Sequence, residues 1–152
     1  MKTLLIALAG LGALALTTPA HAGGVALCIE VGTNAVNNGD DKQYFLRRSA
    51  SMDSRALDLE ARDDFRNRRY GGNNSPVPAC MRSDRSLEHG EYVVIRGGRR
   101  LDYSGTPYTR WALGYGSNRT AAEREAVRQL RLRDGGYQED RHGYSVVEFG
   151  SF

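Results

Sequence analysis

Two histidines with the same local sequence are the first candidates for chemistry in this chain. His89 and His142 each begin a motif of the form H-G-x-x-V-V. Two imidazoles that face one substrate can act as an acid-base pair, as in phosphodiester cleavage, while an arginine holds the phosphate. The motif therefore predicts a small hydrolase or nuclease if the fold brings the two rings together. The alternative is that both are solvated residues of turns, because each precedes a glycine at the start of an expected strand.

Arginine supplies the second candidate, because its guanidinium binds a carboxylate or a phosphate through paired hydrogen bonds. Arg99 and Arg100 lie close in sequence to Trp111 and Tyr115, whose rings could stack on a ligand. A further series at helical spacing, on one expected helix face, consists of Arg124, Arg128 and Arg131. These residues predict a binder of an acidic glycan or of nucleic acid. The alternative is a solvated surface in a chain whose basic residues are nearly all arginine.

The chain has only two cysteines, Cys28 and Cys80. An even count in an exported protein predicts a structural disulfide. Closing such a long loop would stabilise the fold by about 4 kcal/mol in the chain-entropy model. A metal site needs more ligands at closer spacing, so we predict neither a metal nor a cofactor. The sequence also lacks the short motifs of phosphate-binding loops, zinc peptidases and serine hydrolases.

The first 22 residues have the organisation of a secretory signal peptide. Lys2 precedes an apolar run from Leu4 to Leu16, and Ala20-His21-Ala22 fits a cleavage site. The run is shorter than the about 20 residues that a spanning helix needs, and no later stretch is apolar enough to cross a membrane. We therefore expect a mature domain of residues 23–152 in the periplasm or outside the cell.

The overall composition is typical of one small globular domain. The chain is 40% hydrophobic and 26% charged, which excludes collagen, a coiled coil and a wholly disordered protein. Its 21 Lys and Arg against 18 Asp and Glu give a net charge of +3, which is too balanced to indicate nucleic-acid binding by itself.

Hydrophobic periodicity predicts the elements that must position these residues. The expected strands cover residues 25–31, 42–48, 91–96, 99–103, 109–115 and 144–149. Helices are expected after Ser54 and from Thr120, where Thr120 and Glu123 fit a capping box, and Gly97-Gly98 fits a two-residue hairpin turn. The order strand, strand, helix, strand occurs twice, which predicts an internal duplication with pseudo-repeats at about 23–97 and 98–152.

Two such units would combine their strands, because neither alone buries enough surface. We expect an α+β fold with a mainly antiparallel sheet and both helices on one face. The alternative is two small lobes related by an approximate two-fold axis.

Residues 109–133 contain an aromatic-glycine strand, Trp-Ala-Leu-Gly-Tyr-Gly, followed by a helix with an A-E-x-x-A motif. This stretch is similar to small exported bacterial domains of unknown function. The resemblance implies export and no particular chemistry. The small size, the expected disulfide and the absence of a catalytic motif favour a non-enzymatic binding protein, inhibitor or envelope accessory factor, whose partner would be a protein or an acidic ligand.

Overall fold

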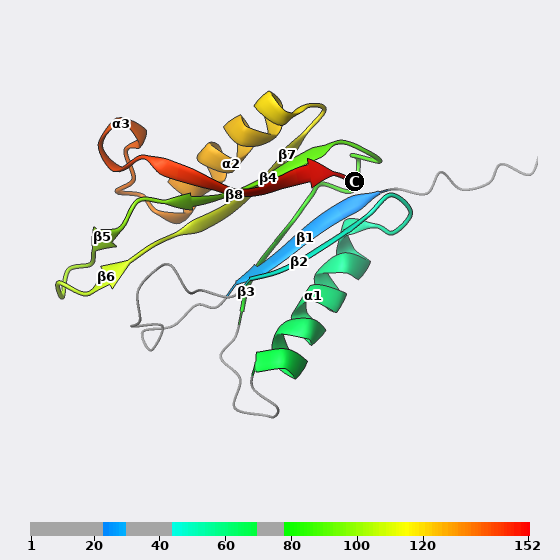
Figure 1. The fold of residues 1–152 in the computed structure, drawn as a ribbon, viewed down its shortest axis with the longest axis horizontal. Coiled ribbons are helices and arrows are strands. Elements are labelled where there is room, and N and C mark those ends of the chain that lie inside the picture. The colour runs from blue at the N-terminus through cyan, green and yellow to red at the C-terminus, as the bar shows by residue number, and fades with distance from the viewer. Residues whose placement is uncertain (1–22, 30–43, 70–77) are drawn as a thin grey trace, which may run out of the picture.

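The computed structural model describes residues 23–29, 44–69 and 78–152. In this part the chain forms an α+β fold of antiparallel sheets and helices, as the periodicity predicts (Figure 1). The expected signal peptide, residues 1–22, lies outside the described residues. Within them, no helix combines the length and the apolar character needed to cross a membrane.

The first sheet has β1 (Gly24–Ile29) at its centre, between β2 (Tyr44–Ser49) and β3 (Ala79–Arg82). Helix α1 (Ser54–Arg69) covers one face of this sheet. It begins after Asp53, whose carboxylate accepts hydrogen bonds from two backbone amides of the first turn. The apolar residues that α1 buries recur at helical spacing, as Leu57, Ala61 and Phe65.

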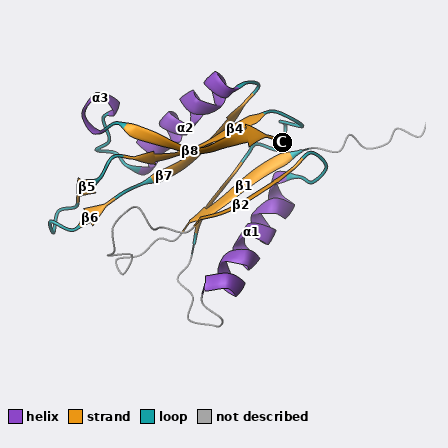
Figure 2. Cartoon of the chain, viewed as in Figure 1, coloured by secondary structure: helices purple, strands orange, loops and turns teal. Residues whose placement is uncertain are grey.

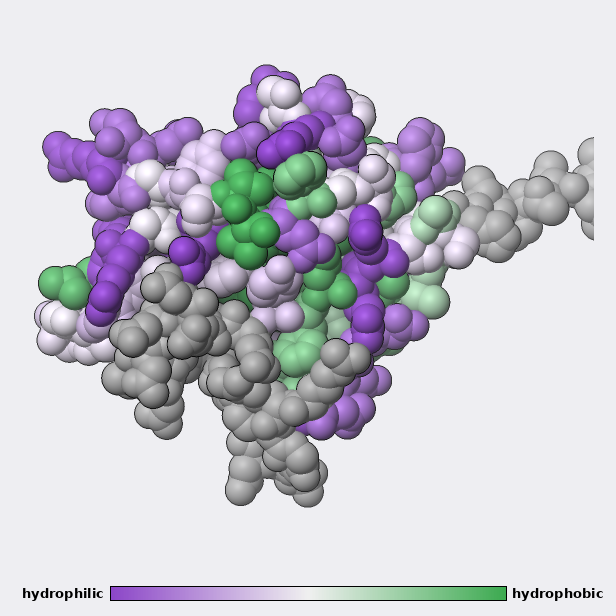
Figure 3. Space-filling model, in the orientation of Figure 1, coloured by the Kyte–Doolittle hydropathy of each residue, from purple (hydrophilic) through white to green (hydrophobic). Residues whose placement is uncertain are grey.

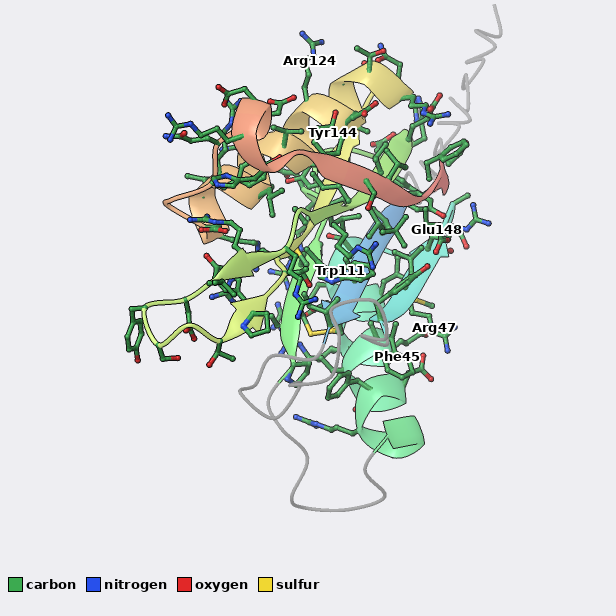
Figure 4. All side chains as sticks on the ribbon, turned by 60° about the vertical axis from the view of Figure 1, so that its left-hand side comes forward. Phe45, Arg47, Trp111, Arg124, Tyr144 and Glu148 are labelled. Carbon is green, nitrogen blue, oxygen red and sulfur yellow. A yellow bond between two sulfur atoms is a disulfide. The ribbon has the colours of Figure 1, made fainter. Side chains whose placement is uncertain are left out.

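The side chains of β2 alternate between the two faces of the sheet. Phe45 points to α1, where its ring lies 5.6 Å from that of Phe65, and Arg47 pairs with Asp64 of the same helix (Figure 4). Tyr44 points to the opposite face. The alternation follows from the two-residue repeat of a strand.

The second sheet has β4 (Glu91–Gly97) at its centre, between β7 (Trp111–Gly116) and β8 (Tyr144–Ser151). Helix α2 (Arg119–Arg133) lies over β7 and β4 and buries Ala122, Ala126, Val127 and Leu130. The predicted capping box is wrong in detail. Asn118 is the N-cap, with its side chain accepting from the Ala121 amide at 2.9 Å, and the Glu123 carboxylate instead accepts from Tyr144.

Gly114 in β7 determines how closely α2 approaches the second sheet. A Cβ at this position would overlap the backbone carbonyl oxygen of Ala122 and the amide nitrogen of Ala126. Only glycine therefore allows the helix and the strand to lie this close together.

The two sheets pack face to face, and the helices lie on the two outer faces (Figure 2). The shared core contains residues of both sheets, including Val25, Leu27, Ile29 and Met81 from the first and Tyr92, Val94, Trp111 and Leu113 from the second. The expectation of both helices on one face is therefore wrong. Every residue of β1 is buried, so this strand needs cover on both faces, and a helix and the opposing sheet provide it.

The strand order is equivalent in the two sheets, with the first strand of each unit at the centre and its last strand at one edge. The expected repeat boundary is at about residues 97/98, whereas the structure places the unpredicted β3 in the first sheet and β4 in the second, so the strands of the two sheets divide between these elements. The two H-G-x-x-V-V motifs also precede non-equivalent strands, since β4 is central and β8 is at the edge. The common topology is compatible with a duplication, which stays a prediction.

A short hairpin leaves the second unit between β4 and β7. Its strands are β5 (Arg100–Leu101) and β6 (Pro107–Tyr108), and it projects at the left of Figure 1. The prediction that Gly97-Gly98 joins β4 to residues 99–103 in one hairpin is wrong, because residues 100 and 101 pair with β6 instead. The short helix α3 (Glu139–His142) precedes β8.

Candidate functional sites

The two histidines lie at opposite ends of β4. Gly90, next to His89, is hydrogen-bonded to Phe152 at the end of β8, whereas Gly98 is hydrogen-bonded to Gly143, next to His142. The seven residues of β4 separate Gly90 from Gly98, so the two positions are about 25 Å apart at the rise of a strand. His89 is exposed, and the His142 Nδ1 accepts a hydrogen bond from the Gln138 amide at 2.8 Å. The fold does not bring the imidazoles to one substrate.

The four candidate binding residues near the middle of the chain are also not brought into one site. Trp111 is 4% exposed in the core between the sheets, where its ring packs at a tilt against Tyr44, with the ring centroids 5.3 Å apart. Tyr115 is half-buried beside α2, and burial raises its pKa. Arg99 and Arg100 belong to the projecting hairpin, so they lie with neither aromatic ring.

Cys28 and Cys80 form the predicted disulfide, directly opposite each other on β1 and β3. The buried carboxylate of Asp58 lies within 4.8 Å of both sulfur atoms. Asp58 is on the face of α1 that packs against the sheet. Its negative charge is balanced by Arg62, at 3.0 Å, and Arg82, at 3.7 Å. Because the sulfur atoms are bonded to each other, they do not provide the thiolates that a metal would require.

A polar cluster that the sequence did not predict joins the two sheets at the β2 and β8 edges. The Glu148 carboxylate accepts hydrogen bonds from the hydroxyls of Tyr44, at 2.8 Å, and Tyr92, at 3.0 Å (Figure 4). Arg48 lies 5.6 Å from the Tyr92 ring centroid. Burial, together with the Glu148 carboxylate, raises the pKa of each tyrosine to about 12. The cluster thus holds the sheets together through groups from three distant strands.

The raised pKa values predict a loss of stability at alkaline pH. The unfolded chain releases its tyrosine protons near pH 10, whereas Tyr44 and Tyr92 in the folded chain hold theirs to about 12. The folded state is therefore favoured below pH 10 and loses this stability as the pH rises to about 12. For Tyr92, which is 1% exposed, the loss should be on the order of 2 kcal/mol. Urea unfolding at stepped pH measures it.

Tyr144 offers an internal control for this measurement. A hydrogen bond to Glu123, with burial second, raises its pKa to about 12 as well. Glu148→Gln should lower the titration midpoints of Tyr44 and Tyr92, followed by tyrosinate absorbance, and leave that of Tyr144 unchanged. Glu123→Gln should lower the midpoint of Tyr144 and leave those of Tyr44 and Tyr92 unchanged. If all tyrosines titrated together near pH 10 while the protein stayed folded, the raised pKa values of Tyr44, Tyr92 and Tyr144 would be contradicted.

The projecting hairpin, residues 99–110, which we call the arm, is held by a dense set of hydrogen bonds at its tip. The Asp102 carboxylate accepts from the Ser104 amide at 2.8 Å, the Ser104 hydroxyl at 2.6 Å and the Thr106 amide at 2.8 Å. These bonds, the hydroxyl first, lower the pKa of Asp102. Gly105 adopts a φ of 79°, which glycine allows without strain. The tip therefore has one well-defined conformation.

The base of the arm is also anchored. Arg100 pairs with Asp134, just after α2, at 2.6 Å, and its guanidinium lies 5.7 Å from the Tyr108 ring centroid. Arg110 lies over the same ring at 5.2 Å. The ion pair thus connects the arm to the domain, and the two cation-π contacts hold the base of the arm together.

The tip of the arm exposes apolar surface. Tyr103 is fully exposed, at 105% of its reference area, and Leu101 is 65% exposed. A hydrophobic spot marks the arm at the left of Figure 3. Sequence reasoning missed both residues, although it predicted the turn at 104–107, because an alternating Leu-x-Tyr pattern also fits an ordinary strand.

Comparison with protein-family models, with curated proteins and with solved structures finds no match for this chain. The resemblance of residues 109–133 to small exported bacterial domains stays a prediction. The function is therefore inferred from the surface of the molecule.

Proposed function

We propose that this protein is a small exported binding domain that engages a partner protein through its arm. The observation that carries the proposal is the fully exposed Tyr103 on a tip that Asp102 holds in one conformation. Large apolar side chains that are presented singly on a rigid projection are suited to enter a pocket of another protein. Tyrosine is among the residues that contribute most binding energy at such interfaces.

The rigidity of the arm supports binding in a second way. Ordering a loop on association opposes binding, by about 0.5–1.5 kcal/mol for each side chain that is immobilised. The hydrogen bonds of Asp102 and the ion pair of Arg100 have already ordered this loop in the free domain. The contacts of Leu101 and Tyr103 with a partner would therefore contribute to affinity with little loss from ordering the loop.

The charges on the arm specify the chemistry of the partner. Arg99 and Arg110 are exposed at the base of the arm, and the one acidic residue of the arm, Asp102, uses its carboxylate within the turn. The arm is thus apolar at its tip and basic at its base. A complementary partner has an apolar pocket for the tip and acidic residues at the entrance of that pocket.

The disulfide fits this role in the compartment that the first 22 residues predict. A covalent bond between β1 and β3 stabilises a domain of modest size outside the cytoplasm, where thiols become oxidised. A binding domain that works in the periplasm or beyond the cell needs this stability, because it works without cytosolic chaperones.

The test compares capture of envelope and culture-medium proteins by three immobilised forms of the mature domain. Leu101→Ala/Tyr103→Ala removes the apolar tip, and Leu59→Ala/Leu132→Ala removes two equally exposed leucines on the helices, at 57% and 67% exposure. We expect one partner to bind the wild type and the helix variant. The arm variant should bind the purified partner at least about 100-fold more weakly.

Two results would overturn the proposal. One is a partner that binds the arm variant as tightly as the wild type. The other is the repeated absence of any saturable protein partner from both extracts. Asp102→Ala separates the contribution of rigidity, because it should weaken binding by about tenfold while leaving both apolar side chains in place.

A further inference from the structure

A line of three arginines on α2 forms a second surface, separate from the arm. Arg124, Arg128 and Arg131 recur at i, i+4 and i+7, so they project from one side of the helix at intervals of about 6 and 4.5 Å. All three line a groove of about 520 Å³ between α2, α3 and the start of β8. Arg124 points away from the body of the domain, and Tyr144 lies across from it on β8 (Figure 4).

The three arginines differ in whether a carboxylate of the protein compensates their charge. Arg128 binds both Glu125 oxygens, at 2.7 and 2.6 Å, and Arg131 binds Glu139 at 2.8 Å. Within the described part of the chain, no carboxylate lies in ion-pair contact with Arg124, although it lines both this groove and the adjoining hollow beside Tyr115. The groove therefore contains one uncompensated cation, Arg124, at one end of a line whose other two cations are already paired.

The other groups of the groove are of kinds that bind sugars. Val127 and the half-buried ring of Tyr144 provide apolar surface, and Thr120 provides a hydroxyl. Glu123 and Glu139 provide acceptors for ligand hydroxyls. These carboxylates would repel duplex nucleic acid, which carries one charge per about 1.7 Å, more strongly than a polymer with one carboxylate on each sugar.

The apolar surface continues past the groove along β8. Phe149 is 52% exposed, with the Arg119 guanidinium 3.7 Å from its ring centroid, and Val146 is 37% exposed on the same strand. Figure 3 shows hydrophobic surface gathered over β8. Helix α2 lies over β7 and β4, so this outer face of β8 is left open to a ligand that is longer than the groove.

We infer that this surface binds an acidic polysaccharide, with one sugar carboxylate on the unpaired Arg124 and that of the next sugar on Arg128, which shares its five donors between this carboxylate and Glu125. A guanidinium and a carboxylate form paired hydrogen bonds, and the intervals along the helix are comparable with the length of one sugar ring. Tyr144 contacts the apolar face of a sugar, and Glu139 accepts its hydroxyls. The inference goes beyond the partner protein proposed above, because it uses none of the residues of the arm.

The test is direct binding of the mature domain to polygalacturonate, a polymer of uronic acid, at low and moderate salt. Arg124→Gln/Arg128→Gln removes the two cations assigned to the ligand, and Arg55→Gln/Arg85→Gln removes the same charge from exposed positions elsewhere. We expect the α2 variant to bind at least about tenfold more weakly and with a smaller salt dependence. The matched variant should bind within about twofold of the wild type.

Two reference polymers make the outcome decisive. Methyl-esterified polygalacturonate has the same sugars without the charge, and single-stranded DNA has one negative charge on each unit but no uronic acid. Equal binding to the methyl ester, equal loss in the two double variants, or tighter arginine-dependent binding to the DNA would each overturn the inference. Absence of binding to polygalacturonate at low salt would do so as well, and none of these results bears on the arm.

Discussion

Removing the disulfide is expected to lower the free energy of unfolding by about 4 kcal/mol, because the bond between Cys28 and Cys80 closes a long loop of the unfolded chain. The bond also joins two neighbouring strands of the first sheet, so its loss leaves the short β3 held to β1 by backbone pairing and packing without a covalent bond. We expect Cys28→Ala/Cys80→Ala to retain the second sheet longer than the first during unfolding. Urea denaturation and hydrogen exchange of the two sheets measure both effects.

The control for this variant is the reduced wild-type protein. Cys28 is fully buried, so replacement by alanine also leaves a small cavity under α1, whereas reduction keeps the sulfur atoms in place. A similar loss in both samples assigns the effect to the covalent bond. Stability within about 0.5 kcal/mol of the oxidised protein in both samples would contradict the prediction.

Gly114→Ala is expected to destabilise the domain by about 3 kcal/mol, although it adds one methyl group. The added Cβ would overlap backbone atoms of Ala122 and Ala126, and neither can turn aside as a flexible side chain can. Helix α2 would have to move away from β7, which opens the cluster of Val93, Ile95 and Leu130. Thermal and chemical denaturation of the purified variant measure the loss.

Gly135→Ala is the matched control. The same methyl group at position 135 meets no atom within 4 Å, so the variant should unfold within about 0.5 kcal/mol of the wild type. Equal stability of the two variants would show that α2 and β7 leave room for a Cβ at position 114.

Several elements of the fold could be predicted from the sequence because their signals are local. The alternation in β1, the strongly apolar β4 and the stripe of Ala122, Ala126 and Leu130 each report on residues a few positions apart. The disulfide was predictable for a different reason, since only one pair of cysteines exists. The short β3 was missed because four residues carry too little periodicity.

The candidate sites were predicted less well, because they depend on contacts between distant residues. The motif shared by His89 and His142 suggested one site, but β4 separates them. Conversely, Tyr44, Tyr92 and Glu148 have no common sequence signal, and the packing of β2 against β8 brings them together. The helical spacing of Arg124, Arg128 and Arg131 was readable, since one helix carries all three.

The sequence by itself determined the α+β class, the main helices, most of the strands and the pairing of the cysteines. Only the tertiary structure decided that the strands divide into two facing sheets, that the histidines stand apart and that Tyr103 is exposed on a braced arm. The physical reason is that a hydrophobic pattern states which face of an element is buried. It does not state which distant surface covers that face. The polar cluster at Glu148 and the separation of the two histidines both depend on which surface does so.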